Sequence, residues 1–438
     1  MASTSRKVIS AAPKTSSDKI FQIDESFDFF ALMAPTFLKL AALTLILTFA
    51  IKSLAIPTAT LPMGIYSPSF RYGEINGIDQ RYTENGSLVR LTDYKSIDFD
   101  AKTLAKFNAQ AQSLISTLNR FGAFNLGDSF NLGTLEIESK PEIKYFAPVL
   151  AYGVNSIWTL GVGLPVIHYK NDVHLAQSFS NIGYYRSQFS GLSTDLDRAL
   201  NTNIGEATQQ VLLNKGYSRL ETRDQQFLGD AQIVSVLKIY EDTDQSVIHQ
   251  ATLNLPTGPQ YNPDDLLALN NFHKTSIENT LGYSRRLGKY FKVIPYTNVK
   301  LFLPEKIDAR VPKSSDDILP DQDSKESVQR IEGALIEVGV QTGIDLFDAF
   351  QISFDYKAGA KSQDRYSGSS GSNYELLSQN SSSRWQKVSA EFVYSTVKSY
   401  FQKKSILPMM LTLSFFDTIS GVNIERKSGQ ELATTFFF

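Results

Sequence analysis

The segment Thr134-Leu-Glu-Ile-Glu-Ser-Lys-Pro-Glu-Ile-Lys-Tyr-Phe-Ala-Pro-Val-Leu-Ala-Tyr152 decides the fold, because its side chains alternate with a period of two residues. Successive side chains of a β-strand point to opposite faces, so the segment predicts one charged face and one mainly apolar face. A lysine on the lipid side of a membrane barrel costs about 2–4 kcal/mol at the midplane. The charged face is therefore predicted to line an aqueous lumen with Glu136, Glu138, Lys140, Glu142 and Lys144.

The same alternation recurs towards the end of the chain. It predicts further lumen-facing side chains at Asp355, Lys357 and Glu391, each flanked by outward apolar residues. Eleven segments are predicted as strands: 133–152, 156–169, 231–240, 245–256, 277–287, 291–303, 330–341, 348–361, 385–398, 408–418 and 430–438. Their connections alternate between short and long, as the periplasmic turns and outer loops of membrane barrels do.

These patterns predict an all-β protein, a transmembrane antiparallel β-barrel that occupies residues 133–438, with a helical extracellular loop at 170–230. Bacterial barrels have an even number of strands, so we expect about 12, with ten and fourteen as alternatives. The twelfth strand should come from residues 56–132, and Gly86-Ser-Leu-Val-Arg-Leu91 is one candidate. The alternating segment 431–438 ends in Phe438 and resembles the closing strand of bacterial outer-membrane barrels. We expect barrel-assembly machinery to recognise it.

Residues 1–55 are predicted to be an export signal, with cleavage after Ala55. The uncharged run Leu40–Ile51 follows Lys39 and precedes the small residues Ser53 and Ala55. It is shorter than the roughly 20 residues that a membrane-spanning helix needs. An uncleaved anchor that reaches back to residue 29 is the alternative, and translation could start at Met33 instead of Met1.

Residues 56–132 are predicted to form an N-terminal plug or arm. Residues 56–97 contain prolines, four glycines and Arg71, Arg81 and Arg90, and we expect these arginines to pair with lumen carboxylates if the segment enters the barrel. An ordinary periplasmic arm is the alternative. Apolar residues at helical spacing predict helices near 101–120 and 194–215. The second helix either gates the outer mouth or simply packs on the loops.

Two strand pairs carry a family resemblance. Ala147-Pro-Val-Leu-Ala-Tyr-Gly-Val-Asn-Ser-Ile-Trp-Thr-Leu-Gly-Val-Gly-Leu-Pro165, together with 228–258, resembles the opening hairpins of channels in the long-chain fatty acid transporter superfamily. The closest likeness is to its aromatic-compound branch from phenol-degradation pathways. The resemblance implies passive uptake of a small hydrophobic molecule through a plugged barrel. The Asn-Pro-Ala plug signature of the fatty acid transporters is not found in residues 56–100, so only the architecture carries over.

Composition and motifs argue against catalysis and nucleic-acid binding. The chain has no cysteine, and its four histidines (His168, His174, His249 and His273) form no HxxxH or HExxH pair. We therefore expect no enzyme activity, catalytic residue, metal or cofactor, and we interpret the acidic residues 316–323 as a solvated loop. Removal of residues 1–55, which carry a charge of +2, changes the formal charge from −2 to about −4, without a basic block.

The sequence thus predicts a channel or transporter for small hydrophobic molecules in the outer membrane of a Gram-negative bacterium. Its expected partners are outer-membrane lipid and a small hydrophobic ligand. The alternative is a structural or surface-interaction barrel whose filled lumen transports nothing.

Overall fold

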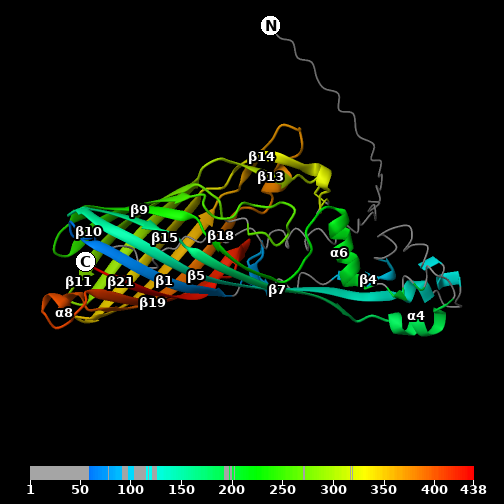
Figure 1. Ribbon diagram of the computed structural model, residues 1–438, viewed down its shortest axis with the longest axis horizontal. Helices are drawn as coiled ribbons and strands as arrows, with labels where there is room; N and C mark the ends of the chain where they lie inside the picture. Colours follow the sequence, from blue (N-terminus) through cyan, green and yellow to red (C-terminus); the bar gives the residue numbers. More distant parts are fainter. Residues whose placement is uncertain are drawn as a thin grey trace, which may run out of the picture.

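The protein is a closed β-barrel (Figure 1). The computed structural model describes residues 59–438, except 77, 91–96, 103–114, 117, 121–125, 192–196, 198–199, 202, 270–271, 316 and 318. The predicted signal region 1–55 therefore lies outside the described residues. Twelve antiparallel strands form the ring: β1 (Tyr66–Asn76), β5 (Asn131–Asn155), β6 (Trp158–Gly163), β9 (Ala231–Glu241), β10 (Gln245–Leu255), β11 (Ser276–Leu287), β12 (Phe291–Phe302), β15 (Leu335–Phe347), β16 (Phe350–Lys361), β18 (Ser383–Ser395), β19 (Met409–Val422) and β21 (Ser428–Phe436).

Strand β1 closes the ring. It pairs with β21 on one side, in the register Tyr72 to Leu432, and with β5 on the other, in the register Gly73 to Tyr145. The predicted strand count and fold class are confirmed, but the twelfth strand is 66–76 and not the candidate 86–91. Those residues contribute the three-residue strand β3 (Leu88–Arg90), far shorter than the 9–11 residues that span a membrane.

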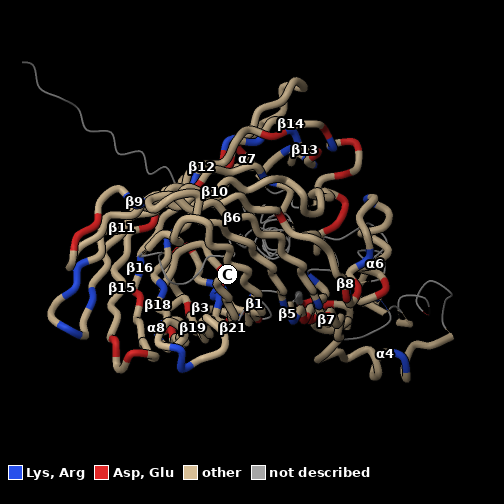
Figure 2. The backbone as a smooth tube through the Cα atoms, turned by 60° about the vertical axis from the view of Figure 1, so that its left-hand side comes forward, with Lys and Arg blue, Asp and Glu red and all other residues tan. Residues whose placement is uncertain are grey.

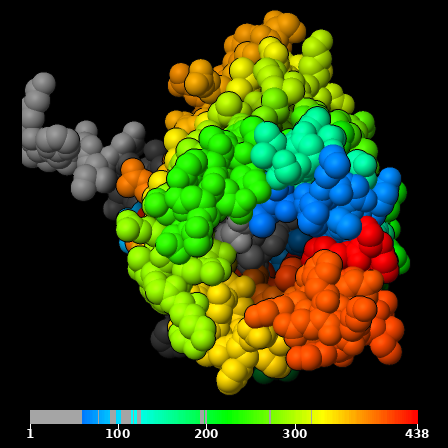
Figure 3. Space-filling model, turned by 90° about the vertical axis from the view of Figure 1, so that its left-hand side faces the viewer, coloured from blue at the N-terminus to red at the C-terminus, as the bar shows by residue number. Residues whose placement is uncertain are grey.

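The connections fall at opposite ends of the ring. Turns 156–157, 242–244, 288–290 and 348–349, and the turn 396–408 that holds α8 (Val397–Phe401), lie at one end, which we call the short-turn end. Seen from this end, the strands follow one another around the ring in sequence order (Figure 3). The long connections lie at the other end, which we call the loop end. The connection between β19 and β21 is shorter than expected, because it contains only residues 423–427.

Strand β5 is longer than the wall needs. Its residues 143–155 pair with β1 or β6 in the ring, but residues 134–142 continue beyond the ring edge, and residues 134–146 pair with β7 (Val166–Ser178). With β4 (Ile97–Asp100), β8 (Arg223–Leu228), α4 (Ile182–Phe189) and α6 (Ile204–Asn214) they form a projection that we call the arm (Figure 1). Its apolar core joins the inner face of β5 to both helices and includes Leu135, Ile137, Tyr185 and Leu212.

The predicted helices have different outcomes. Helix 194–215 is present as α6, which Asn203 caps by accepting a hydrogen bond from the Glu206 amide, and Gly216 ends it at φ 76°. Its predicted first half lies mainly outside the described residues, as does most of the predicted helix 101–120. None of the helices in the described part of the chain is both long and apolar enough to cross a membrane.

The outer surface of the ring is apolar. Large side chains such as Phe70, Leu150, Val338, Phe354 and Phe392 are exposed on it, and charged residues gather at the turns, in the loops and along the arm (Figure 2). An apolar surface that encircles the molecule matches the hydrocarbon layer of a membrane. The helix η1 (Leu126–Ser129) belongs to the arm, where the Tyr185 hydroxyl donates to the Leu126 carbonyl. The remaining elements lie at the loop end: β2 (Gln80–Tyr82), β13 (Glu305–Arg310), η2 (Gln322–Ser324), β14 (Lys325–Ile331), β17 (Arg365–Ser367), α7 (Glu375–Ser378) and β20 (Ile424–Glu425).

Candidate functional site

The inner wall of the ring is the candidate site. Asp355, Lys357 and Glu391 face the lumen, because the residues that alternate with them, such as Phe354 and Phe392, are exposed on the outer surface. Asp355 and Glu391 are only 9% and 6% exposed. A charge survives such burial only when other polar groups compensate it. For Asp355 the Tyr296 hydroxyl supplies such a group.

The predicted lumen position of the five charged residues of β5 is wrong. Glu136, Glu138, Lys140, Glu142 and Lys144 lie on the outer face of the arm, where Lys140 pairs with Glu138 and Lys144 with Glu142. The opposite, odd-numbered face is the buried one, with Ile143 fully buried. The physical reason is the length of β5. This part of the strand lies beyond the membrane-spanning wall, so its outer face meets water, and the lipid-facing residues of the same face begin at Phe146.

Nine side chains on the inner face form a belt, which we call the lumen belt. They come from seven strands: Arg71, Tyr145, Tyr296, Glu337, Asp355, Lys357, Trp385, Glu391 and Glu431. Glu431 accepts a hydrogen bond from the Tyr145 hydroxyl at 2.6 Å and lies 3.7 Å from the Arg71 guanidinium. Arg71 is therefore a wall residue and does not belong to a plug, and its partner is Glu431, not the predicted carboxylates of β5.

A second group in the belt centres on Glu337. Its carboxylate accepts hydrogen bonds from Asn298 at 3.1 Å and from the Trp385 indole at 3.3 Å, and the Lys357 ammonium lies 3.6 Å away. Next to it, the Tyr296 hydroxyl donates to Asp355 at 2.9 Å. Donors from the adjacent strand and from the next strand but one thus hold Glu337, Asp355 and Glu431, which is what a buried charge requires.

Aromatic rings of the belt lie over glycines of the adjacent strand. A Cβ built on Gly73 would lie 2.2 Å from Cζ of Tyr145, and one on Gly339 would lie 2.5 Å from Cζ of Tyr296. Trp385 covers Gly359 in the same way, at 2.4 Å. Each pair is directly opposed across two strands. Sequence reasoning missed these residues, although the alternation did contain one signal, a glycine at an inward position of a wall strand.

A small sheet at the loop end covers part of the lumen. Strands β2, β3 and β20 pair with one another, and Tyr82 and Ile424 pack against Trp385 of the inner wall. Arg81 pairs in register with Glu425, and Arg90 ends β3. Within the predicted plug 56–97, residues 66–76 are therefore wall, and residues 80–90 lie at the mouth of the barrel. Burial raises the pKa of Glu425, and Lys427 and Arg81 oppose that rise.

The long loops are tied together by two buried groups of charges. Arg310 uses all five of its guanidinium donors: two go to Asp264 at 3.0 and 2.8 Å, and three go to the carbonyls of Lys215, Gly216 and Pro320 at 2.7–3.0 Å. The guanidinium also lies 3.8 Å from the centre of the Tyr217 ring. One side chain thereby joins β13, the end of α6 and the loop after β10.

The second group joins Lys274, Glu332, Lys361 and Asp364. Lys274 lies 2.5 Å and Lys361 3.6 Å from Glu332, and Lys361 lies 2.6 Å from Asp364. Burial alone would raise the pKa of Glu332, but Lys274 and Lys361 outweigh it and hold that pKa below its ordinary value. Burial conversely lowers the pKa of Lys274. Two cations and two carboxylates give a neutral group, so we assign all four as charged.

The histidines have separate structural partners. His168 contacts Asp224 at 2.6 Å on the exposed face of the arm, His249 contacts Asn279 at 3.2 Å, and His273 contacts the Gly258 carbonyl at 3.0 Å. His174 faces Glu138 in register. In the acidic loop, Asp321 pairs with Lys215 at 2.7 Å, while Asp316 lies outside the described residues. The described part of the chain contains no group of three His, Asp or Glu side chains that could hold a metal ion.

The ring and its inner belt define a closed antiparallel transmembrane β-barrel. The chain is similar to an outer-membrane channel from Pseudomonas putida F1, with 11% identity over 88% of this chain and 100% of that chain, and a TM-score of 0.49. It is also similar to the Pseudomonas putida toluene transporter TodX, with 8% identity over 86% of this chain and 90% of that chain, and a TM-score of 0.33. It is similar as well to the transport unit of the autotransporter AIDA-I from Escherichia coli, with 6% identity over 93% of this chain and 98% of that chain, and a TM-score of 0.37.

No protein-family model and no curated protein sequence matches the chain. The strand pairing of the chain itself defines the barrel.

Proposed function

We propose that this protein is a bacterial outer-membrane channel through which small hydrophobic molecules enter by passive diffusion. A closed ring with an apolar outer face satisfies the one requirement of a membrane-spanning sheet, which is that no strand edge meets lipid. Short turns at one end and long loops at the other support an orientation with the turns in the periplasm and the loops outside.

The lumen belt carries the proposal. Its acidic members Glu337 and Glu431 have cationic neighbours in Lys357 and Arg71, so these two charges are compensated within the wall. Rings of Tyr145, Tyr296 and Trp385 lie along the same wall. A wall of aromatic faces and internally bonded polar groups suits a small apolar solute better than a hydrated ion. The burial of the belt also disfavours the wide aqueous pore of a general porin.

The arrangement at the loop end supports the same proposal. The sheet of β2, β3 and β20 narrows the mouth, and the Arg310 and Glu332 groups hold the long loops to one another. A solute that enters must therefore be small. We also propose that barrel-assembly machinery recognises β21, whose chain continues to Phe438, which pairs with Tyr66 through two backbone hydrogen bonds.

A structural barrel with a filled lumen is the second candidate function. The same burial favours it, because Glu337, Glu391 and Glu431 are each less than a tenth exposed. The two functions differ in one property: a channel binds and passes solute at the belt, whereas a structural barrel does not.

The two tryptophans of the chain provide the test. Trp158 lies on the outer face, where its indole donates to Ser235 at 2.9 Å, and Trp385 lies in the lumen belt. In the Trp158→Phe variant, Trp385 is the fluorophore that reports on the lumen. We expect bound toluene to shift its emission saturably in refolded protein, and brominated phospholipid not to quench it. The Trp385→Phe variant should show the reverse.

Planar-bilayer recordings of the same proteins complete the test. We expect a small ion conductance that toluene reduces, because solute and ions share the lumen. A Trp385 signal that is insensitive to toluene, together with the absence of conductance, would exclude the channel and leave the structural barrel.

A further inference from the structure

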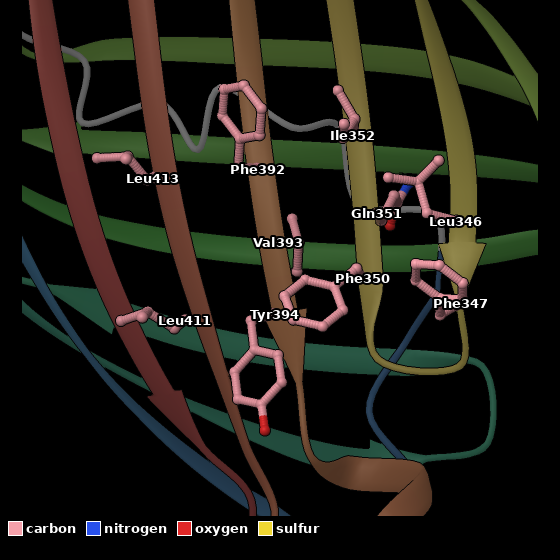
Figure 4. Close-up of a pocket in the computed structure, with 10 residues that line it drawn as sticks. All are labelled: Leu346, Phe347, Phe350, Gln351, Ile352, Phe392, Val393, Tyr394, Leu411 and Leu413. Atoms are coloured by element: carbon pink, nitrogen blue, oxygen red, sulfur yellow. The ribbon is translucent and has the colours of Figure 1, made fainter.

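An apolar groove lies on the outer face of the wall at the short-turn end. Its volume is about 450 Å³, and four adjacent strands line it (Figure 4). The apolar side chains that line it are Leu346 and Phe347 from β15, Phe350 and Ile352 from β16, Phe392 and Tyr394 from β18, and Leu411 and Leu413 from β19. The rings of Phe350 and Tyr394 are 5.0 Å apart. The groove faces away from the lumen belt, so a solute in the lumen does not occupy it.

The turn 396–408 protrudes directly beside this groove, because it connects β18 to β19 (Figure 3). Its side chains Phe401 and Ile406 are 78% and 92% exposed. From Ser395 to Leu413 the sequence contains Lys398, Lys403 and Lys404 and no acidic residue. Lys398 pairs with Asp348 at 2.5 Å, while Lys403 and Lys404 are exposed and form no salt bridge with the described residues.

The backbone at Lys403 is unusual. Lys403 has φ of 59°, the left-handed region that glycine normally occupies just after a helix end, and the Lys404 amide donates to the Ser399 carbonyl at 2.8 Å. A lysine at this position costs conformational free energy that a glycine would not. The cost is consistent with a role for the charge.

We propose that the groove and these two lysines form a binding site for one anionic phospholipid, with an acyl chain in the groove and the headgroup phosphate on Lys403 and Lys404. Exposed Phe401 and Ile406 would enter the headgroup boundary beside it, as apolar side chains of interfacial segments do. Phosphate oxygens accept strong hydrogen bonds from ammonium groups, which sets this lipid apart from the zwitterionic lipid that merely surrounds a barrel. The inference rests on the proposed membrane orientation, with the short turns in the periplasmic leaflet, and does not depend on transport.

Native mass spectrometry of the purified barrel in detergent tests this proposal. Phosphatidylglycerol and phosphatidylcholine with identical acyl chains are titrated separately. We expect one phosphatidylglycerol to saturate the wild-type protein, with at least about fivefold weaker retention of phosphatidylcholine. Equal retention of the two lipids, or the addition of several lipids without saturation, would overturn the proposal, because both describe ordinary surrounding lipid.

Two variants test the contributions of the lipid headgroup and of the acyl chain separately. Lys403→Gly with Lys404→Gln removes both charges and relieves the backbone at residue 403, so a folding defect is not expected. It should lower phosphatidylglycerol retention to the phosphatidylcholine level. Ile352→Trp should fill the groove and weaken both lipids, whereas Leu237→Trp, outward-facing on the opposite wall, should change neither. Unchanged retention in the lysine variant would also overturn the proposal. Lipid binding without conductance would refute only the proposed function.

Discussion

Replacement of Arg310 by alanine should release the long loops while the ring stays intact. The Arg310 side chain is 3% exposed, and its loss leaves three carbonyl oxygens and Asp264 without the donors described above. Removal of one partner of a buried ion pair costs about 3–5 kcal/mol. Lys325 remains 2.9 Å from Asp264 and keeps part of its compensation. We therefore expect a local loss of about 3–5 kcal/mol in the free energy of loop opening.

Amide hydrogen exchange measures this loss residue by residue. The Ser218 amide donates to the Asp264 carbonyl at 2.7 Å, and the Val311 amide donates to the Ser324 carbonyl at 3.0 Å. Since about 1.4 kcal/mol is a factor of ten, both amides should exchange roughly 10² to 4 × 10³ times faster. Amides in the pairing of β16 with β18 should be unaffected, because they belong to the ring.

Two further variants make this prediction specific. Arg310→Lys should lower the free energy of loop opening almost as much as Arg310→Ala does, because an ammonium group with three donors cannot replace a planar guanidinium with five. Arg219→Ala removes an exposed arginine of the same loop, 3.2 Å from Glu206, and should cost less than about 1 kcal/mol. Exchange in Arg310→Ala no faster than in Arg219→Ala, or wild-type exchange in Arg310→Lys, would refute the reasoning.

Three other predictions concern the wall and the loops. Gly73→Val should lower the urea midpoint of unfolding by the equivalent of about 1–3 kcal/mol, because its Cβ would overlap the Tyr145 ring; an unchanged midpoint would show that the ring can move aside. Phe354→Lys should destabilise the barrel in vesicles by about 2–4 kcal/mol, and the same change at exposed Tyr184 of the arm by less than about 0.5 kcal/mol; equal effects would place both residues in water. The pKa of Glu332 is held below its ordinary 4.5, so its ionised form contributes stability above pH 4.5 that is lost as the pH falls through the lower folded value. Protease cleavage of the loops should accordingly increase in acid, and Glu332→Gln should be cleaved readily at both pH 6 and pH 3.

The wall could be predicted from sequence because lipid and lumen impose opposite chemistry on alternate residues. Phe354 and Asp355 are neighbours in the chain, yet one is exposed on the outer surface and the other is buried inside. The charged face of β5 was wrongly assigned to the lumen. Alternation shows that one face of a strand contacts water, but it does not show whether that face lies inside or outside the barrel. Glu138 and Phe146 share one face of β5, and that face meets water at the first residue and lipid at the second.

The lumen belt and the first strand could not be predicted from the alternation of apolar and polar residues. Tyr66, Phe70 and Tyr72 alternate with polar residues, so β1 did carry the strand signal, but the prolines and glycines around it favoured an irregular plug. The belt depends on pairs such as Tyr145 with Glu431, which are 286 residues apart in the chain. A single sequence does not show which strands become neighbours. Such pairs can therefore be identified only from the structure of the closed ring.

The continuity of β5 has a mechanical consequence. At roughly 3.3 Å per residue its 25 residues extend over about 80 Å, around twice what a membrane crossing uses. Residues 134–146 of β5 pair with β7 and residues 149–155 pair with β6, so one strand connects the arm with the ring. In the orientation proposed above, a load applied to the tip of the arm is therefore transmitted along β5 to the strands of the ring.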